Sequence, residues 1–74
     1  MERYKNLGGD SNVNAYELGD GSITVRFNDG SHYQYTNQSA GAAAIASMQQ
    51  LAVQGRGLNS FIMRYARKAY ARKW

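Results

Sequence analysis

Basic residues crowd the C-terminal end of this 74-residue chain. The first thirty residues hold all five acidic side chains and three basic ones, whereas the remaining forty-four hold six basic side chains and no acidic one. The six are Arg56, Arg64, Arg67, Lys68, Arg72 and Lys73. A positive field on one side of a small protein attracts polyanions such as nucleic acid, nucleotides or an anionic membrane. The pattern predicts a class of partner and no reaction.

Aromatic side chains accompany these bases. Tyr70 and Trp74 lie within the last five residues, among Arg72 and Lys73. Flat rings beside cations stack the bases of single-stranded nucleic acid. We therefore treat Tyr70 and Trp74, together with the six bases, as candidate contacts to nucleic acid or phosphate.

The residues that usually carry catalysis are sparse. His32 is the only histidine and there is no cysteine, so one chain cannot assemble a zinc site. No nucleophile pattern accompanies His32, which we interpret as a strand surface residue. The carboxylates fall near turns or in the N-terminal arm, where Asp suits the backbone. We expect no enzymatic activity, no cofactor and no metal.

A glycine-rich segment, residues 55–60, allows two interpretations. Backbone N–H groups of such a loop at the start of a helix can cradle a phosphate, and Arg56 lies within it. The segment lacks the lysine and the length of a P-loop, and the end of one helix followed by the cap of the next explains the same residues. Both interpretations stay open at this point.

The elements that position these groups begin with three strands. Residues 12–18, 22–27 and 31–36 alternate between polar and apolar side chains, and turn sequences separate them at residues 19–21 and 28–30. The first half of the chain is therefore predicted to be a three-stranded antiparallel β-meander. Residues 1–10 form an N-terminal arm, and residues 11–74 form the domain.

The register of the second hairpin decides the role of Tyr33 and Tyr35. A two-residue loop would place both rings on the side away from Val25, as an exposed stacking platform. A three-residue loop, residues 28–30 with a left-handed Gly30, would place them in the core instead. We favour the three-residue loop because a small core needs the rings. Tyr33 and Tyr35 remain possible ring contacts through their hydroxyls.

The second half of the chain is predicted to form two helices. Residues 39–54 are good helix formers with an apolar stripe, and Gly55 suits the C-terminal cap. Asn37 or Ser39 could cap the start of this helix. Residues 58–74 form the second helix, capped by Asn59 or Ser60.

On the second helix, the core stripe is expected to hold Leu58, Phe61, Ile62, Tyr65 and Ala69. Arg64, Lys68 and Arg72 follow at intervals of four residues and form a basic ridge. Met63, Tyr70 and Trp74 form a second apolar line behind it, with Arg67 among them. Three interpretations of that line stay open: a protein–protein or homo-oligomer seam, an aromatic-basic surface for nucleic acid, or scattered surface residues.

Length and composition bound the remaining possibilities. Seventy-four residues make one domain, near the lower limit for an unaided hydrophobic core. The N-terminus has no apolar core of signal-peptide length, and no run approaches a membrane span. We expect a cytoplasmic protein. Docking of the basic C-terminal helix on a membrane surface is a third hypothesis, disfavoured because the sheet should already occupy the core stripe.

With these strands and motifs in place, residues 11–65 resemble the KTSC domain, a short module at the C-terminus of some lysyl-tRNA synthetases and a stand-alone protein of bacteria and phages. The resemblance is carried by an opening strand at residues 11–16 and by two motifs: Ile23-x-Val25-x-Phe27-x-x-Gly30-x-x-Tyr33-x-Tyr35, and Gly55 with Asn59, Ile62 and Arg64. The proline expected after Tyr-x-Tyr is missing, and Gly57 stands where the family often has an aromatic residue. The resemblance implies this fold, and RNA binding is a proposal for the family.

We therefore predict an α+β domain, a three-stranded antiparallel β-meander followed by two α-helices. Its predicted function is non-enzymatic binding of RNA or another phosphate-rich ligand through a basic C-terminal helix. The alternative is a homo-oligomeric small protein, of phage type, that sequesters a small nucleotide or acts as a protein-interaction module.

Overall fold

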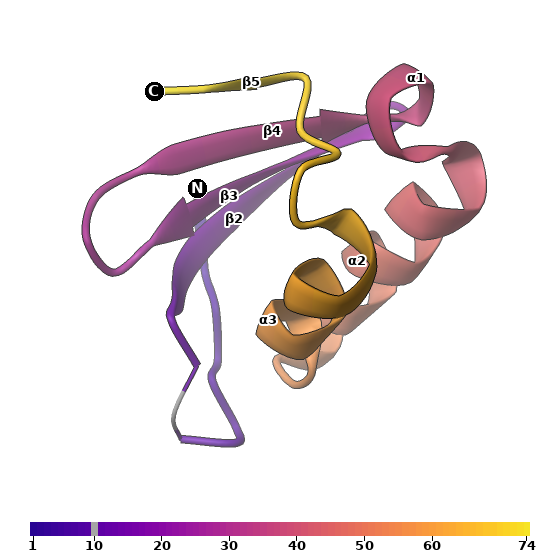
Figure 1. Ribbon diagram of the computed structural model, residues 1–74. Helices are drawn as coiled ribbons and strands as arrows, with labels where there is room; N and C mark the ends of the chain where they lie inside the picture. Colours follow the sequence, from indigo (N-terminus) through magenta and orange to yellow (C-terminus); the bar gives the residue numbers. More distant parts are fainter. Residues whose placement is uncertain (10) are drawn as a thin grey trace.

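The computed structural model describes residues 1–9 and 11–74. It is an α+β fold in which helices cover one face of a single antiparallel sheet (Figure 1). The strands lie side by side in chain order: β1 (Glu2–Arg3), β2 (Val13–Gly19), β3 (Ser22–Phe27), β4 (His32–Thr36) and β5 (Arg72–Lys73). The helices are α1 (Asn37–Ala40), α2 (Ala42–Gln54), α3 (Leu58–Phe61) and the π-helical turn η1 (Ile62–Ala66).

The three central strands confirm the predicted meander, but the prediction of three strands in total was wrong. Each end of the chain adds a two-residue strand to one edge of the sheet, β1 beside β2 and β5 beside β4. Both additions are too short to show an alternating pattern. They form because the edges of the meander present unpaired backbone N–H and C=O groups.

The loop between β3 and β4 has the predicted three residues. Val25 lies opposite Tyr33 and Ile23 opposite Tyr35, so both tyrosines point to the same side as the apolar residues of β3. Gly30 has φ +88°, a left-handed conformation that an L residue with a Cβ rarely adopts. The observed register therefore places Tyr33 and Tyr35 on the core side of the sheet, as predicted.

The predicted first helix is interrupted near its start. Thr36 caps α1 through a reciprocal pair of hydrogen bonds with Ser39, and Gly41 then separates α1 from α2. The prediction that Asn37 or Ser39 caps this helix was therefore wrong. At the other end, the prediction of Gly55 is confirmed: it is left-handed, and its N–H bonds to the last turn of α2.

The second predicted helix is much shorter than residues 58–74. Helical backbone runs from Leu58 through α3 and η1 to Ala66, and the chain then turns back along the sheet as β5 (Figure 1). No side chain caps α3; Gly57 occupies the cap position, so the predicted caps Asn59 and Ser60 were wrong.

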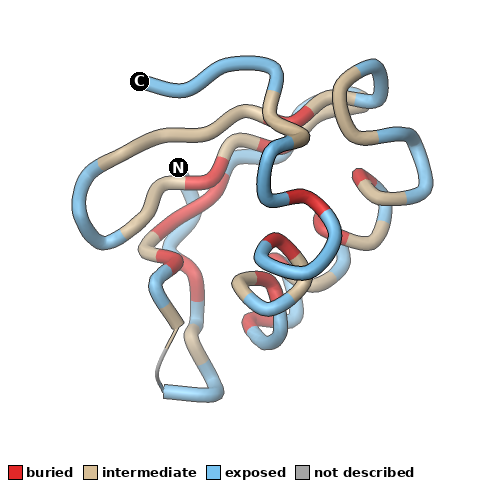
Figure 2. The backbone as a smooth tube through the Cα atoms, in the orientation of Figure 1, coloured by how far each residue is buried: buried red, intermediate tan, exposed pale blue. Residues whose placement is uncertain are grey.

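The core lies between one face of the sheet and the helices. Figure 2 shows the buried parts of the strands and helices turned toward one another. The sheet contributes Tyr16, Ile23, Val25 and Tyr35, and the helices contribute Ile45, Met48, Ala52, Leu58, Ile62 and Ala66. We call this side of the sheet the inner face and the opposite side the outer face.

The N-terminal arm belongs to this core. Tyr4 is only 3% exposed, and its hydroxyl accepts a hydrogen bond from the backbone N–H of Leu58 at 3.3 Å. Leu7 N–H also bonds to the carbonyl of Gly55 at 2.8 Å. The last residue of the predicted arm, Asp10, lies outside the described residues. The contacts of Tyr4 tie the beginning of the chain to the start of the last helix.

Candidate nucleic-acid interface

The outer face carries a row of side chains that crosses the sheet and is polar or aromatic except at the buried Ala15 of β2. Residues paired directly across an antiparallel sheet point to the same side. Arg3 pairs with Ala15, Ala15 with Arg26, and Arg26 with His32. His32 exchanges two backbone hydrogen bonds with Trp74, at 2.8 and 2.9 Å, which places Trp74 at the end of the row. We call Arg3, Arg26, His32 and Trp74, with Arg72 beside them, the outer row.

Three flat groups meet at the β5 end of the outer row. The rings of His32 and Trp74 are stacked, with centroids 5.3 Å apart and an interplanar angle of 9°. The guanidinium carbon of Arg72 lies 4.5 Å from the centroid of the Trp74 ring, a cation–π geometry. Trp74 nevertheless remains 54% exposed. A large ring held in a fixed orientation at the surface, beside a cation, is a preformed stacking surface.

A β-bulge positions the next cation of the row. The register between β2 and β3 shifts between Val13 and Ala15, so Asn14 is the extra residue. Its amide oxygen accepts hydrogen bonds from Nε and Nη2 of Arg26, at 2.9 and 2.7 Å. This holds the Arg26 guanidinium against the sheet, in a hollow that Arg3 also lines.

The structure divides the predicted site residues of the last helix among three places. Arg72 and Trp74 lie in the outer row. Tyr70 and Lys73 lie on the inner side, where the Tyr33 and Tyr70 rings meet edge to face at 5.1 Å. Arg64, Arg67 and Lys68 remain exposed on and just after η1. The predicted ridge of Arg64, Lys68 and Arg72 therefore does not exist as one surface.

The second apolar line was wrong for the same reason. Trp74 lies against His32 on the outer face, whereas Met63 and Tyr70 both border Tyr33 on the inner side, so the three do not form one line. The core stripe is also rotated: Ala66 is buried in place of Tyr65, which is 68% exposed. Self-association stays a prediction; Met63, which belonged to the predicted seam, and Tyr65, which did not, are both exposed on η1.

The two tyrosines of β4 differ in burial. Tyr35 is 1% exposed, and this burial, followed by the neighbouring Tyr33 and Tyr70, raises the pKa of its hydroxyl to about 12. Tyr33 is half-buried and packs edge to face against Phe27, with centroids 5.3 Å apart. Tyr35 is therefore a core residue, while the Tyr33 ring borders an open cleft.

The glycine-rich segment acts as the connection between two helices. Gly55 and Gly57 both have left-handed backbone, with φ of +79° and +85°. Arg56 is exposed between them and lines a shallow hollow with Tyr4 and Ser60. The phosphate-cradle interpretation stays a prediction.

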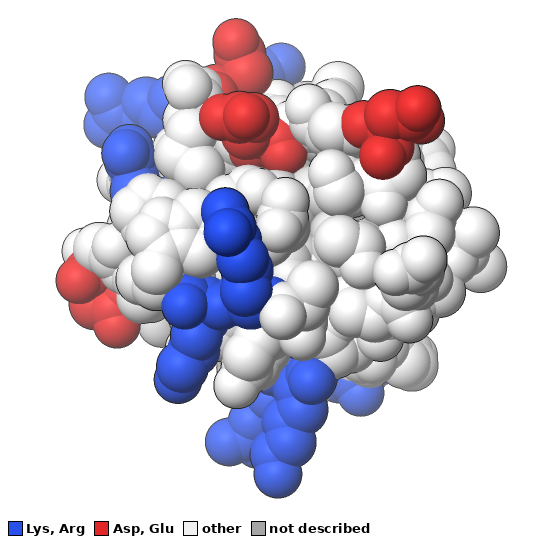
Figure 3. All heavy atoms as spheres, turned by 90° about the horizontal axis from the view of Figure 1, so that it is seen from above, with Lys and Arg blue, Asp and Glu red and all other residues white. Residues whose placement is uncertain are grey.

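Sequence reasoning missed Arg3, Arg26 and Asn14 as members of the site. Arg26 alternates with Val25 and Phe27 within β3, so the strand pattern alone places it on the outer face. Its proximity to Trp74 depends on β5, which the sequence does not indicate. Figure 3 shows the molecule from above, where Lys and Arg side chains lie in several separate places on a face that also carries Asp and Glu side chains.

Comparison of the chain with protein-family models, curated proteins and solved structures finds no match. The resemblance to the KTSC domain therefore stays a prediction. Among the residues that the structure describes, no helix has the length and apolar character that a membrane crossing requires. Within residues 1–9 and 11–74, no three His, Cys, Asp or Glu side chains gather as metal ligands would.

Proposed function

We propose that this protein binds single-stranded nucleic acid on the outer face of its sheet. The observation that carries the proposal is the exposed, stacked group of His32, Trp74 and Arg72. A base stacks on the Trp74 ring in place of the Arg72 guanidinium. The guanidinium then lies near enough to pair with an adjacent phosphate.

The arrangement favours a single strand over a duplex. Bases in a duplex are already stacked on one another, so a ring at a protein surface stacks with them only when they are unpaired. Arg26 and Arg3 continue the row across the sheet from Trp74, and they supply charge along the path of a backbone. The proposal moves the predicted binding surface from a helix to the sheet.

The intrinsic fluorescence of the protein provides a direct test, because Trp74 is the only tryptophan. We expect single-stranded RNA or DNA oligonucleotides to quench this fluorescence, and a matched duplex to do so much less. With three or four phosphates neutralised, log K should fall against log salt with a slope of roughly −2 to −3. Binding that is insensitive to salt would contradict the proposal.

Two aromatic substitutions test whether the sheet or the helix carries the binding surface. Trp74→Ala should weaken oligonucleotide binding, measured by fluorescence anisotropy of a labelled strand, by about 1–3 kcal/mol, the usual effect of losing one stacked base. Tyr65→Ala removes an exposed ring from η1, 68% exposed against 54% for Trp74, and serves as the matched control. If Tyr65→Ala weakens binding and Trp74→Ala does not, the helical surface is the interface and the proposal fails.

A further inference from the structure

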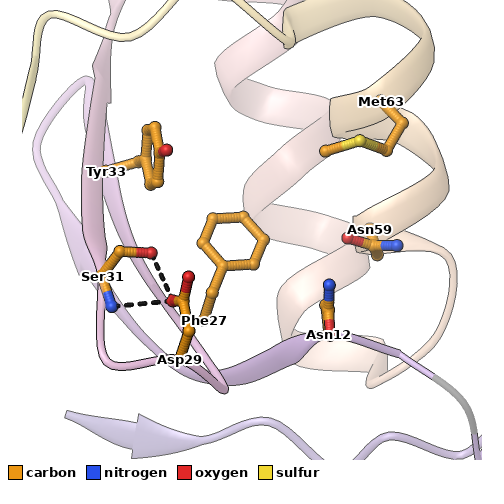
Figure 4. A pocket seen from close by; sticks show the side chains of 7 residues that line it. All are labelled: Asn12, Phe27, Asp29, Ser31, Tyr33, Asn59 and Met63. Atoms are coloured by element: carbon orange, nitrogen blue, oxygen red, sulfur yellow. Dashed lines mark hydrogen bonds between the residues drawn. The ribbon is translucent and has the colours of Figure 1, made fainter.

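A cleft on the inner side of the molecule opens between the β3–β4 hairpin and the last helix. It encloses about 260 Å³. Figure 4 shows Phe27 and Tyr33 on the sheet side, Met63 and Asn59 on the helix side, and Asp29 near the hairpin loop. Ligand pockets for drug-sized molecules begin at about 300 Å³, so this cleft fits one small ring system.

One polar atom in the cleft has no partner. Among the described residues, the amide oxygen of Asn59 is buried and accepts no hydrogen bond. Buried polar atoms are nearly always bonded, because losing their contact with water costs free energy. Figure 4 shows this oxygen turned toward the sheet, and Asn59 lines the cleft, so a small rotation of the amide would let the oxygen accept a hydrogen bond from an N–H group of a ligand.

The walls of the cleft suit a ligand with a flat, apolar surface. The Phe27 and Tyr33 rings meet edge to face at 5.3 Å, and the Met63 thioether faces them from the helix (Figure 4). Methionine is flexible and polarisable, and its sulfur makes favourable contacts with aromatic rings. Met63 is 50% exposed, so it can adjust to a ring placed between it and the sheet.

The end of the cleft near the hairpin supplies a second acceptor. The hydroxyl of Ser31 donates to the Asp29 carboxylate at 2.6 Å, and the backbone N–H of Ser31 donates at 3.0 Å. These two hydrogen bonds lower the pKa of Asp29, which keeps the carboxylate charged. Both bonds reach the same oxygen, which leaves the other oxygen to accept from a ligand.

We propose that this cleft binds a nucleobase that carries an exocyclic amino group. The base lies between Met63 and the Phe27 ring, and one of its N–H groups donates to the Asn59 amide oxygen. Uracil fits poorly, because its only base N–H outside the glycosidic nitrogen lies between two carbonyls, which would face protein acceptors. The site does not depend on the outer row, and it binds a free nucleoside or one base of a longer strand.

Titration with free nucleosides tests the proposal on the intact protein. Adenosine, cytidine and guanosine should shift the NMR signals of the Met63 methyl group and the Asn59 side-chain amide, and uridine should shift them much less. No shift for any nucleoside at about 5 mM would overturn the proposal, because the dissociation constant would then lie above the millimolar range. Equal binding of uridine would overturn it as well.

The substitution Asn59→Leu tests whether the Asn59 side chain binds a ligand or stabilises the fold. The substitution removes the unpartnered acceptor and adds a better helix former, so we expect the melting temperature to stay the same or rise. Nucleoside affinity should fall at least about tenfold, because the hydrogen bond is lost. Ser60→Leu, one residue along and outside the cleft, is the matched control and should leave affinity unchanged. A lower melting temperature for Asn59→Leu, or unchanged affinity, contradicts the proposal.

Two further variants keep the result interpretable. Met63→Ala truncates an exposed side chain on the helix side of the cleft, opposite the Phe27 and Tyr33 rings, so it should weaken nucleoside binding without unfolding the protein. Trp74→Ala should leave the nucleoside-induced shifts of the Met63 and Asn59 signals unchanged while it weakens oligonucleotide binding. Loss of these shifts in Trp74→Ala would place the base on the outer row and overturn the separate cleft site.

Discussion

The two faces of the β3–β4 hairpin differ in what covers them. On the inner face, Ile23, Val25 and Tyr35 are buried against the helices. On the outer face, Arg26 and His32 are half-exposed, and no described helix packs over them (Figure 1). Alternation along the same strands supplies both sets of side chains.

This difference separates stability from binding. Substitutions on the inner face should act on the free energy of unfolding, because they remove buried apolar surface. Substitutions on the outer row should act on affinity for a polyanion and leave folding nearly unchanged. The predictions below test that separation, beginning with the largest expected effect.

Tyr35→Ala should unfold most of the protein. Removing a buried aromatic ring costs about 3–5 kcal/mol, which is close to the whole stability of many small domains. Far-UV circular dichroism and thermal melting measure this loss. A variant that keeps the melting temperature of the original chain would show that the inner face is not the core.

Alkaline pH should destabilise the protein through the same residue. The raised pKa of Tyr35, about 12 in the folded chain, means that the folded state holds the proton more tightly than the unfolded state, whose pKa is near 10. Its contribution to stability is therefore fully present below about pH 10 and is lost as the pH rises to about 12, by on the order of 2–3 kcal/mol.

Denaturant unfolding at several pH values measures this slope. Tyr35→Phe keeps the ring and removes the titrating group, so most of the decline between pH 10 and 12 should disappear. An equally steep decline in Tyr35→Phe would assign the alkaline sensitivity to other groups.

A pair of arginine substitutions tests the outer row with a smaller effect. Arg72→Gln should reduce the salt slope of oligonucleotide binding by about 0.7, which corresponds to one phosphate contact with a single strand. Arg64→Gln removes the same charge from η1 and should leave the slope unchanged. Melting temperatures of both variants should match that of the original chain. A larger effect for Arg64→Gln would assign the interface to the helix.

The strands and their register could be predicted because local chemistry specifies them. Period-two alternation identified β3, and the sequence Asn28-Asp29-Gly30 indicated a three-residue loop. Together these place Tyr35 in the core. The left-handed end of α2 at Gly55 was predictable in the same way, since it depends on one residue type.

The last helix was predicted too long because its pattern continues past its real end. Residues 67–74 contain good helix formers, and local propensity alone would extend the helix. In the folded chain, Ala71 N–H bonds to the carbonyl of Gln34 at 2.6 Å, and Tyr70 packs on Tyr33. Pairing with the open edge of β4 therefore outweighs helix propensity, and the predicted basic ridge is divided.

By itself, the sequence determined the central meander, the burial of Tyr35, and the concentration of positive charge after residue 55. The tertiary structure alone decided where that charge lies. The edge of β4 offers hydrogen bonds to any strand, and the sequence does not record which segment takes them. Because residues 71–74 form these hydrogen bonds, Trp74 lies against His32 on the outer face, and Lys73 lies beside Tyr33 and Tyr70 on the inner side.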